Sequence, residues 1–359
     1  MTSVLFISHE FPPMVGGAGV VCENIAKLLL RQGWDIRVIT TKIKNRPPPP
    51  VPLSECPDIR FIQPLFFLLP FLRWKRQYSR IIINDMGSLL FALLFLNRAD
   101  RKRTIYILQG QDHRNFGNNK LILRLVGYDR KFAAFFRQID RIIAVSNFVK
   151  EDFIRHTGLT EIAEKTKIVH NFVDESMFFY KDKKEKVEIP ILLTVTRIDK
   201  MKGLEDIHNI LLLLSKDKKF QWLVIGNGKD AVWFSELIAE SPIKSSIEWL
   251  QNVARSDLSD YYRTADVFIL LSNYVEAFGL VYIEASSCGT PVIGRDSGGV
   301  REAILSGKTG FLVKDLQEAY QILHDEEYAR LDRLQVASHS MKYAADRQIS
   351  LVVDVIRNN

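Results

Sequence analysis

Short apolar runs alternate with helix-forming segments along almost the whole chain, and this alternation constrains the fold more than any other feature. Residues 3–9, "SVLFISH", form an apolar run that predicts a buried strand. The loop "EFPPMVGGAG" follows, and "VVCENIAKLLLRQG" then has helical spacing up to Gly33, before the next apolar run "DIRVITT". A strand, a glycine loop, a helix and a strand make a βαβ unit, whose right-handed crossover implies a parallel sheet.

The same alternation continues in two blocks. The first block has candidate strands at 80–85, 104–110, 141–146 and 167–172, and the second at 191–199, 220–228, 246–250, 266–272 and 290–296. The charged segment 180–190 between them is poor in apolar residues and predicts a linker, while the proline run at 45–52 predicts an extended loop. We therefore expect two Rossmann-like α/β domains, 1–180 and 181–340. Such sheets place ligands beyond the carboxyl ends of their strands, here between the domains.

Composition excludes several classes of protein. The 359 residues are 47% hydrophobic and 25% charged, as in ordinary globular proteins of two domains. Three cysteines without a C-x-x-C pair argue against a disulfide framework or a structural zinc site, and they fit a reducing cytoplasm. The start of the chain lacks the pattern of a signal peptide, and the apolar runs 64–72 and 89–96 are too short to span a bilayer. We expect a cytoplasmic protein that is not integral to a membrane.

The charge of the chain is uneven. Residues 1–180 hold 26 basic and 16 acidic side chains, a net of +10, whereas 181–359 hold 23 and 26, a net of −3. Such asymmetry predicts a polyanionic partner for the first half, with an unpartnered, solvated basic face as the alternative. Between 59 and 84 no residue is acidic, and apolar and aromatic side chains flank Arg73, Lys75 and Arg76. This pattern suits an anionic membrane surface, and a core helix with a basic end explains it equally well. No motif indicates nucleic acid binding.

The stretch "EAFGLVYIEASSCGTPVIG", residues 276–294, places Glu276 and Glu284 eight positions apart. Gly279 is a poor residue for a helix interior, so the better interpretation is a loop that ends just before it and a helix that carries Glu284 about two turns in. The backbone N–H groups of Gly279 and Leu280 then lie at a helix N-terminus, where anions bind. Two carboxylates beside such a site predict a ligand with phosphate and hydroxyl groups, and two solvated glutamates are the simpler alternative.

Over nearly its whole length the chain resembles the retaining GT-B-fold glycosyltransferases of the family-4 type. The motifs that carry the resemblance are "PPMVGGAG", "AVSNFVKEDF", "LTVTRIDKMKGLEDI", "LVIGNGKD", the stretch 259–304 and "GKTGFLV". The resemblance implies two Rossmann-like domains facing across a cleft, with the acceptor bound by the first and the donor by the second. The helix at 341–359 is then expected to pack back on the first domain. The donor would be a UDP- or GDP-sugar, and no cofactor is implied.

The resemblance also implies roles for individual residues. Arg197 and Lys202 look like the cation pair that stabilises the leaving diphosphate, so no metal is required, and no Asp-x-Asp motif is present. By similarity Glu276 binds the donor sugar close to the reacting carbon, and Glu284 accepts hydrogen bonds from the ribose hydroxyls. Segment 250–258 borders the base. The expected donor-binding residues are, besides Glu284, Gly16, Gly17, Gln109, Gly226, Asn227, Gly228, Val253, Phe278, Gly279 and Leu280.

Two positions depart from the family pattern. The family often has a His-Gly pair after the strand that corresponds to 104–108, whereas this chain has Gln109 and Gly110, so either Gln109 or the nearby His113 takes that place. Phe172 also stands in a segment where the family commonly shows Asn-Gly. The expected acceptor is a glycan or a lipid-linked intermediate of cell-surface polysaccharide or lipopolysaccharide synthesis. The alternatives are a nucleotide-sugar epimerase of the same fold and a non-catalytic relative that binds nucleotide-sugars.

Overall fold

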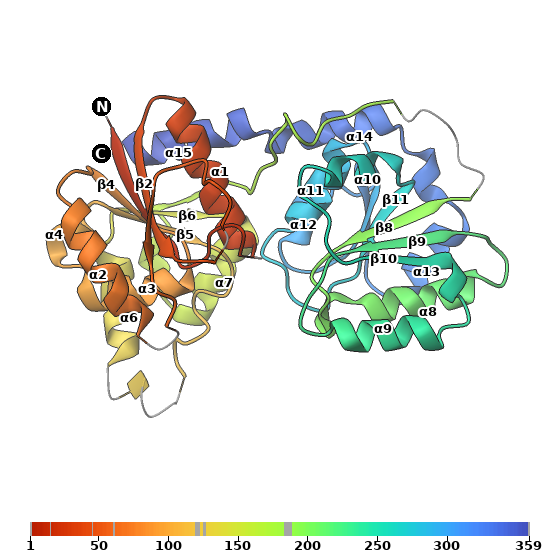
Figure 1. The fold of residues 1–359 in the computed structure, drawn as a ribbon, viewed down its shortest axis with the longest axis horizontal. Coiled ribbons are helices and arrows are strands. Elements are labelled where there is room, and N and C mark those ends of the chain that lie inside the picture. Colours follow the sequence, from red (N-terminus) through yellow and green to blue (C-terminus); the bar gives the residue numbers. More distant parts are fainter. Residues whose placement is uncertain are drawn as a thin grey trace. The chain divides into compact units, whose positions relative to one another are not determined.

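The computed structural model describes residues 2–14, 16–44, 46–59, 62–118, 123–124, 127–182 and 189–357. The chain divides into two compact units. One unit consists of Met1–Asn171 together with Asp346–Asn359, and the other of Phe172–Ala345. Each unit is built on a parallel sheet with helices packed against it, so the α/β class expected from the sequence is confirmed (Figure 1).

The sheet of the first unit has seven strands within the described residues, in the order β3-β2-β1-β4-β5-β6-β7, and all neighbours are parallel. Its central strands are buried on both faces, which is why they appear in the sequence as unbroken apolar runs. The prediction of a strand over 167–172 was too long, since β7 ends at Ile168. The strands are β1 (Ser3–Ile7), β2 (Asp35–Thr41), β3 (Leu53–Cys56), β4 (Arg80–Ile83), β5 (Thr104–Leu108), β6 (Arg141–Ala144) and β7 (Thr166–Ile168).

Helices cover this sheet, and several have well-defined N-caps. The Asp85 side chain accepts a hydrogen bond from Ser88 N at the start of α3, and Ser146 caps α7 in the same way. From Asp346 onward the last helix belongs to the first unit, where the Arg357 guanidinium lies over the Trp34 ring. The helices are α1 (Gly17–Arg31), α2 (Gln63–Trp74), α3 (Met86–Phe95), α4 (Arg98–Arg101), α6 (Tyr128–Gln138), α7 (Asn147–Thr157) and α15 (Ala345–Arg357).

The sheet of the second unit has six parallel strands in the described part of the chain, in the order β10-β9-β8-β11-β12-β13. Alternate residues of β9 enter different cores: Trp222 and Val224 pack in one apolar cluster, and Leu223 and Ile225 in another. Helices therefore cover both faces of this sheet. Its strands are β8 (Ile191–Val195), β9 (Gln221–Ile225), β10 (Ile247–Leu250), β11 (Val267–Leu270), β12 (Val292–Arg295) and β13 (Gly310–Val313). Its helices are α8 (Leu204–Leu214), α9 (Ala231–Glu240), α10 (Leu258–Thr264), α11 (Leu280–Ser287), α12 (Val300–Ala303), α13 (Leu316–His324) and α14 (Arg333–Ser340).

The boundary between the units falls at 171/172, earlier than the expected 180/181. Val173 forms a parallel bridge with Ala344, and Phe178 is buried in a core of the second unit. These residues therefore belong to the second unit although they precede the charged segment. For the same reason residues 341–345 stay with the second unit, and the part of the chain that returns to the first begins at 346 rather than 341.

The strand order of each sheet reverses once. In the first sheet the reversal lies between β1 and β4, and in the second between β8 and β11. At such a point the connections from two neighbouring strands leave toward opposite faces, which opens a crevice beyond the carboxyl ends of the strands. We therefore expect ligands to bind at the loops after β1 and β4 in the first unit, and at those after β8 and β11 in the second.

Candidate functional site

Lys202 is held at the reversal point of the second sheet. It ends a short 3-10 turn, Lys200–Lys202, that follows β8, and the Asp199 carboxylate accepts a hydrogen bond from Met201 N at 3.0 Å. The next residue, Gly203, has φ +71°, and a Cβ there would lie 1.9 Å from the Leu271 carbonyl oxygen. Only glycine lets the turn lie this close to the end of β11. Arg197, two residues beyond β8, is exposed.

Glu276, in the loop after β11, faces Lys202 directly. The Lys202 Nζ lies 2.6 Å from Glu276 Oε1, and the two side chains are only 13% and 19% exposed. The backbone of this loop is fixed as well, because the Glu276 carbonyl accepts a hydrogen bond from Gly299 N at 2.8 Å. The structure thus brings together a cation and a carboxylate that the sequence separates by 74 residues. A phosphate that binds Lys202 must compete with this carboxylate.

Helix α11 begins beside this pair, as the sequence predicted. Gly279 is its N-cap, with φ 97°, and the helix runs from Leu280 to Ser287. Phe278 is buried against the Tyr343 ring, and the Tyr282 hydroxyl donates a hydrogen bond to the Leu270 carbonyl at 2.8 Å. These contacts fix the N-terminus of α11, with its partial positive charge, at the end of β11.

Glu284 is almost completely buried in α11, and its carboxylate has two partners. The Tyr262 hydroxyl donates a hydrogen bond to Oε2 at 3.1 Å, and the Arg255 guanidinium contacts Oε1. Burial and the nearby Glu284 charge raise the pKa of Tyr262, so this phenol stays protonated and can donate. The resemblance placed segment 250–258 beside the base, but the sequence did not single out Arg255. A single arginine in a loop carries no recognisable motif.

The turn after β9 packs closely against the end of β8. A Cβ on Gly226 would lie 1.9 Å from the Thr196 carbonyl oxygen, and a Cβ on Gly228 would lie 2.3 Å from that of Ile198. This contact explains both glycines around Asn227, which is exposed. Val253, in the loop after β10, packs against the apolar core. Apart from Glu284, which lies within α11, every expected site residue of the second unit thus lies on a loop or helix start at the carboxyl edge of its sheet.

In the first unit, Gln109 follows β5, one strand away from the reversal point, and contacts Asn84 in the loop after β4. Its Nε2 donates a hydrogen bond to Asn84 Oδ1 at 3.0 Å, and Asn84 Nδ2 in turn donates to Ser8 Oγ at 2.9 Å. Gly16 is the extended N-cap of α1, and Gly17 is its first residue. The loop that carries Gln109 is anchored by the buried Asp112, whose carboxylate accepts hydrogen bonds from Gln109 N, Gly110 N and the Tyr106 hydroxyl. Burial raises the pKa of Asp112.

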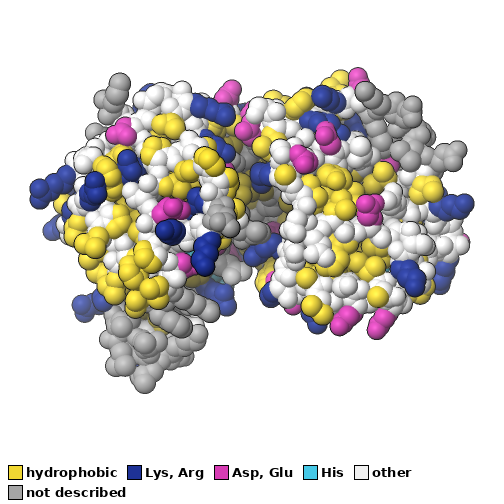
Figure 2. Space-filling view, viewed as in Figure 1, with side chains coloured by type: hydrophobic (Ala, Val, Ile, Leu, Met, Phe, Trp, Pro, Cys, Tyr) yellow, Lys and Arg dark blue, Asp and Glu magenta, His cyan; other side chains and the backbone are white. Residues whose placement is uncertain are grey.

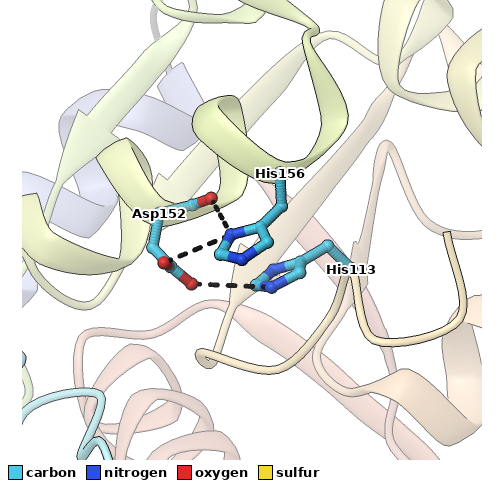
Figure 3. A group of neighbouring side chains, drawn as sticks. All are labelled: His113, Asp152 and His156. Atoms are coloured by element: carbon cyan, nitrogen blue, oxygen red, sulfur yellow. Dashed lines mark hydrogen bonds and ion pairs between the residues drawn. The ribbon is translucent and has the colours of Figure 1, made fainter. Parts of the chain in front are cut away.

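His113 points away from this network. Its Nε2 lies 3.5 Å from Asp152 Oδ2 on α7, and its ring stacks on that of His156 (Figure 3). Burial lowers the pKa of His113. Of the two candidates for the histidine of the family pattern, Gln109 therefore lies at the end of the central strands, and His113 belongs to a different cluster.

The expected membrane residues lie at the C-terminal end of α2, and one of them is not available to bind lipid. Lys75 is not a free surface cation, because its Nζ lies 3.0 Å from Asp100 Oδ2, and the side chain is only 20% exposed. Arg73 and Arg76 are exposed. Large apolar side chains next to them are exposed too: Leu65, Leu69 and Leu72 on α2, with Leu90 and Leu94 on α3. Figure 2 shows hydrophobic side chains gathered over this part of the first unit. None of the described helices combines the length and apolarity needed to cross a bilayer.

Two family models match adjacent halves of the chain. The family Glycosyltransferase Family 4 matches residues 15–176, and Glycosyl transferases group 1 matches 177–328. N-acetyl-alpha-D-glucosaminyl L-malate synthase from Bacillus anthracis is 26% identical over 345 residues, which cover 89% of this chain and 87% of that protein.

Solved structures share the fold. Anabaena HepE, in complex with UDP and glucose, superposes with a TM-score of 0.80 at 17% identity and covers 99% of both chains. WaaG, a glycosyltransferase involved in lipopolysaccharide biosynthesis, has a TM-score of 0.74 at 16% identity, with 99% of this chain and 100% of WaaG covered. The two family matches are adjacent, and together they span 15–328. The chain therefore has the GT-B fold and belongs to the GT-B glycosyltransferases, with a Glycosyltransferase Family 4 half followed by a Glycosyl transferases group 1 half.

Proposed function

We propose that the protein transfers a sugar from a UDP- or GDP-sugar to an acceptor hydroxyl, with retention of configuration at the anomeric carbon. The observation that carries this proposal is the convergence of Lys202, Glu276 and the N-terminus of α11 at the carboxyl edge of the second sheet. A cation and helix amides suit a diphosphate, and a carboxylate next to them suits sugar hydroxyls. The complex of Anabaena HepE with UDP and glucose supports the choice of donor class.

The proposed chemistry needs no metal for the transfer step. The acceptor oxygen forms a bond to the anomeric carbon on the face from which the diphosphate leaves, and the acceptor proton goes to a phosphate oxygen of the departing group. Negative charge builds up on that group as the bond breaks. Arg197, Lys202 and the backbone N–H groups of Gly279 and Leu280 stabilise this charge, which is the main catalytic contribution. Glu276 orients the donor sugar.

Glu284 is proposed to bind the ribose of the donor. The Tyr262 hydroxyl and the Arg255 guanidinium already use part of its hydrogen-bonding capacity, and an ionised carboxylate has about four acceptor positions. The remaining positions can accept ribose hydroxyls. Tyr262 and Arg255 then act as positioning residues, because they fix the carboxylate before the nucleotide arrives.

We further propose that the acceptor is a glycan or a lipid-linked intermediate of cell-surface polysaccharide or lipopolysaccharide synthesis. The protein would bind peripherally to the inner face of the cytoplasmic membrane. The exposed leucines of α2 and α3 beside Arg73 and Arg76 support this, since such a surface binds anionic lipid through apolar contact and charge together. The likeness of the fold to WaaG is in keeping with that acceptor class.

A ligand screen followed by product analysis tests the proposed activity. Among UDP, GDP, ADP and CMP, we expect UDP or GDP to raise the melting temperature of the purified protein, because a ligand that binds only the native state stabilises it. The matching nucleotide-sugar should then release free nucleoside diphosphate when an acceptor extract is present. Release of an isomerised nucleotide-sugar without an acceptor would instead identify an epimerase. A protein that binds donor without any turnover would be the non-catalytic relative.

A further inference from the structure

A cluster of metal-binding side chains lies in the first unit, and neither the transfer reaction nor the acceptor proposal uses it. It consists of His113, in the loop after β5, and of Asp152 and His156 on α7 (Figure 3). One nitrogen or carboxylate oxygen from each of the three lies within 4.8 Å of the others. The sequence does not reveal this cluster, because His113 is about 40 residues away from the other two along the chain.

We propose that these three side chains bind a divalent transition metal ion of the zinc class. Two imidazoles and one carboxylate are a donor set that zinc prefers. Asp152 and His156 are four residues apart, so both side chains project from the same face of α7. The same i, i+4 spacing on a helix holds two zinc ligands in metalloproteases. The loop of His113 supplies the third ligand from across this face.

The distances within the cluster are close to those a zinc ion requires. Zinc–ligand bonds of about 2.0–2.1 Å in a tetrahedron place two ligand atoms about 3.4 Å apart. Asp152 Oδ2 lies 3.5 Å from His113 Nε2, and Asp152 Oδ1 lies 3.3 Å from His156 Nδ1. The carboxylate is thus already at ligand distance from both rings. These two carboxylate contacts are longer than a good hydrogen bond, whereas His156 Nδ1 also lies 2.9 Å from the Asp152 backbone oxygen, and this hydrogen bond must break before Nδ1 can bind the ion.

The two rings must also rotate for the metal to bind. The two imidazole rings are stacked, with centroids 4.4 Å apart and planes 15° apart, so their nitrogen lone pairs run side by side instead of converging. The His156 side chain is 52% exposed and can tilt toward solvent. The His113 Nδ1 is buried and has no hydrogen-bond partner within the described residues, so no such bond opposes rotation of that ring. Small side-chain movements on a fixed backbone therefore complete a site with one position open to water.

The bound ion would join two connections that leave neighbouring strands, because β5 pairs with β6 and α7 follows β6. The loop of His113 also carries Gln109, and metal binding would hold this loop on α7. The proposal concerns the first unit alone. It does not rest on the proposed transfer chemistry, which uses residues of the second unit.

Zinc titration of the untagged protein tests the site. We expect calorimetry to give one zinc ion per chain, and zinc to raise the melting temperature. Cobalt, as a spectroscopic probe, should show the visible absorption of a tetrahedral site. His156→Asn should weaken zinc binding about 100-fold or more, since even changes to groups behind the ligands cost 10- to 100-fold. Asp152→Asn should weaken it similarly.

The chain offers a matched control. His339, on α14, contacts the backbone oxygen of Gln335 four residues earlier, as His156 contacts that of Asp152. Among the described residues, His339 is not part of any group of three metal-binding side chains. His339→Asn should therefore bind zinc like the wild type. Circular dichroism of each metal-free variant shows whether it is folded. Because His156 is more exposed than Asp152, its replacement should disturb the fold less. The proposal is overturned if the wild type shows no saturable zinc binding. It is also overturned if folded His156→Asn retains wild-type affinity, or if His339→Asn loses as much as His156→Asn.

Discussion

The contact between Lys202 and Glu276 leads to a prediction about their coupling. Lys202→Met keeps most of the length of the side chain and removes its charge. It should lower kcat and weaken the binding of the nucleoside diphosphate. Glu276→Gln should leave nucleoside diphosphate binding intact or tighten it, because it frees Lys202 from a competing carboxylate at 2.6 Å. In the double variant, nucleotide binding should therefore be stronger than in Lys202→Met alone.

The magnitudes follow from the geometry of the pair. Loss of one preorganised donor to developing charge costs about 100- to 1000-fold in kcat, or about 2.7–4 kcal/mol. The side chains are 13% and 19% exposed, so the pair is more strongly coupled than an exposed ion pair, which contributes about 0.2–1 kcal/mol. In Lys202→Met the unpaired Glu276 charge also repels the diphosphate. Two like charges about 4 Å apart at an effective dielectric constant of 20 interact by about 4 kcal/mol, which sets the upper limit. Removal of that charge should restore nucleotide affinity about tenfold.

Two measurements check the coupling. Calorimetry gives the affinity of the wild type, both single variants and the double variant for the nucleoside diphosphate that stabilises the wild type. A coupled assay gives kcat with the corresponding sugar donor. Near wild-type turnover in folded Lys202→Met would refute the proposed role of the lysine. Additive effects on nucleotide affinity, within about 0.5 kcal/mol, would show that the contact has no role in binding.

Three further predictions concern other parts of the molecule. Glu284→Gln should weaken binding of the bare nucleoside diphosphate by about tenfold, a loss typical of one charged hydrogen bond, and calorimetry that finds wild-type affinity would contradict the ribose assignment. Gly228→Ala should lower the melting temperature and weaken nucleotide binding, because its Cβ would lie 2.3 Å from the Ile198 carbonyl oxygen; an unchanged melting curve would show that the turn adapts without cost. The double variant Arg73→Ser/Arg76→Ser should bind phosphatidylglycerol vesicles more weakly than the wild type by about 2 kcal/mol, as measured by sedimentation. High salt should release the wild type from the vesicles. A wild type that stays in the supernatant at low salt would exclude this surface as a membrane contact.

The sequence predicted most of the sheet architecture, for a physical reason. Strands of a parallel sheet are buried on both faces, so β4, β5 and β8 appear as mostly apolar runs between helical segments. β3, which has only four residues at the sheet edge after the proline run, lacks such a pattern and was not predicted. The unit boundary was misplaced because the charged segment is more conspicuous in the sequence than the bridge between Val173 and Ala344.

Pairings across the fold could not be predicted from the sequence. Lys202 and Glu276 were each expected to touch the donor, but their mutual contact depends on how the turns after β8 and β11 pack. The partner of Lys75 was not foreseen either, since Asp100 lies 25 residues further on. Motifs identify residues near one point in the chain, whereas these contacts depend on the sheet order.

A crystal structure with the stabilising nucleoside diphosphate tests the central claim most directly. We predict that the diphosphate oxygens lie within hydrogen-bonding distance of the Arg197 and Lys202 side chains and of the backbone N–H groups of Gly279 and Leu280. The ribose should then contact Glu284. A diphosphate bound away from the carboxyl edge of the second sheet, with the Lys202–Glu276 contact unchanged, would contradict the account.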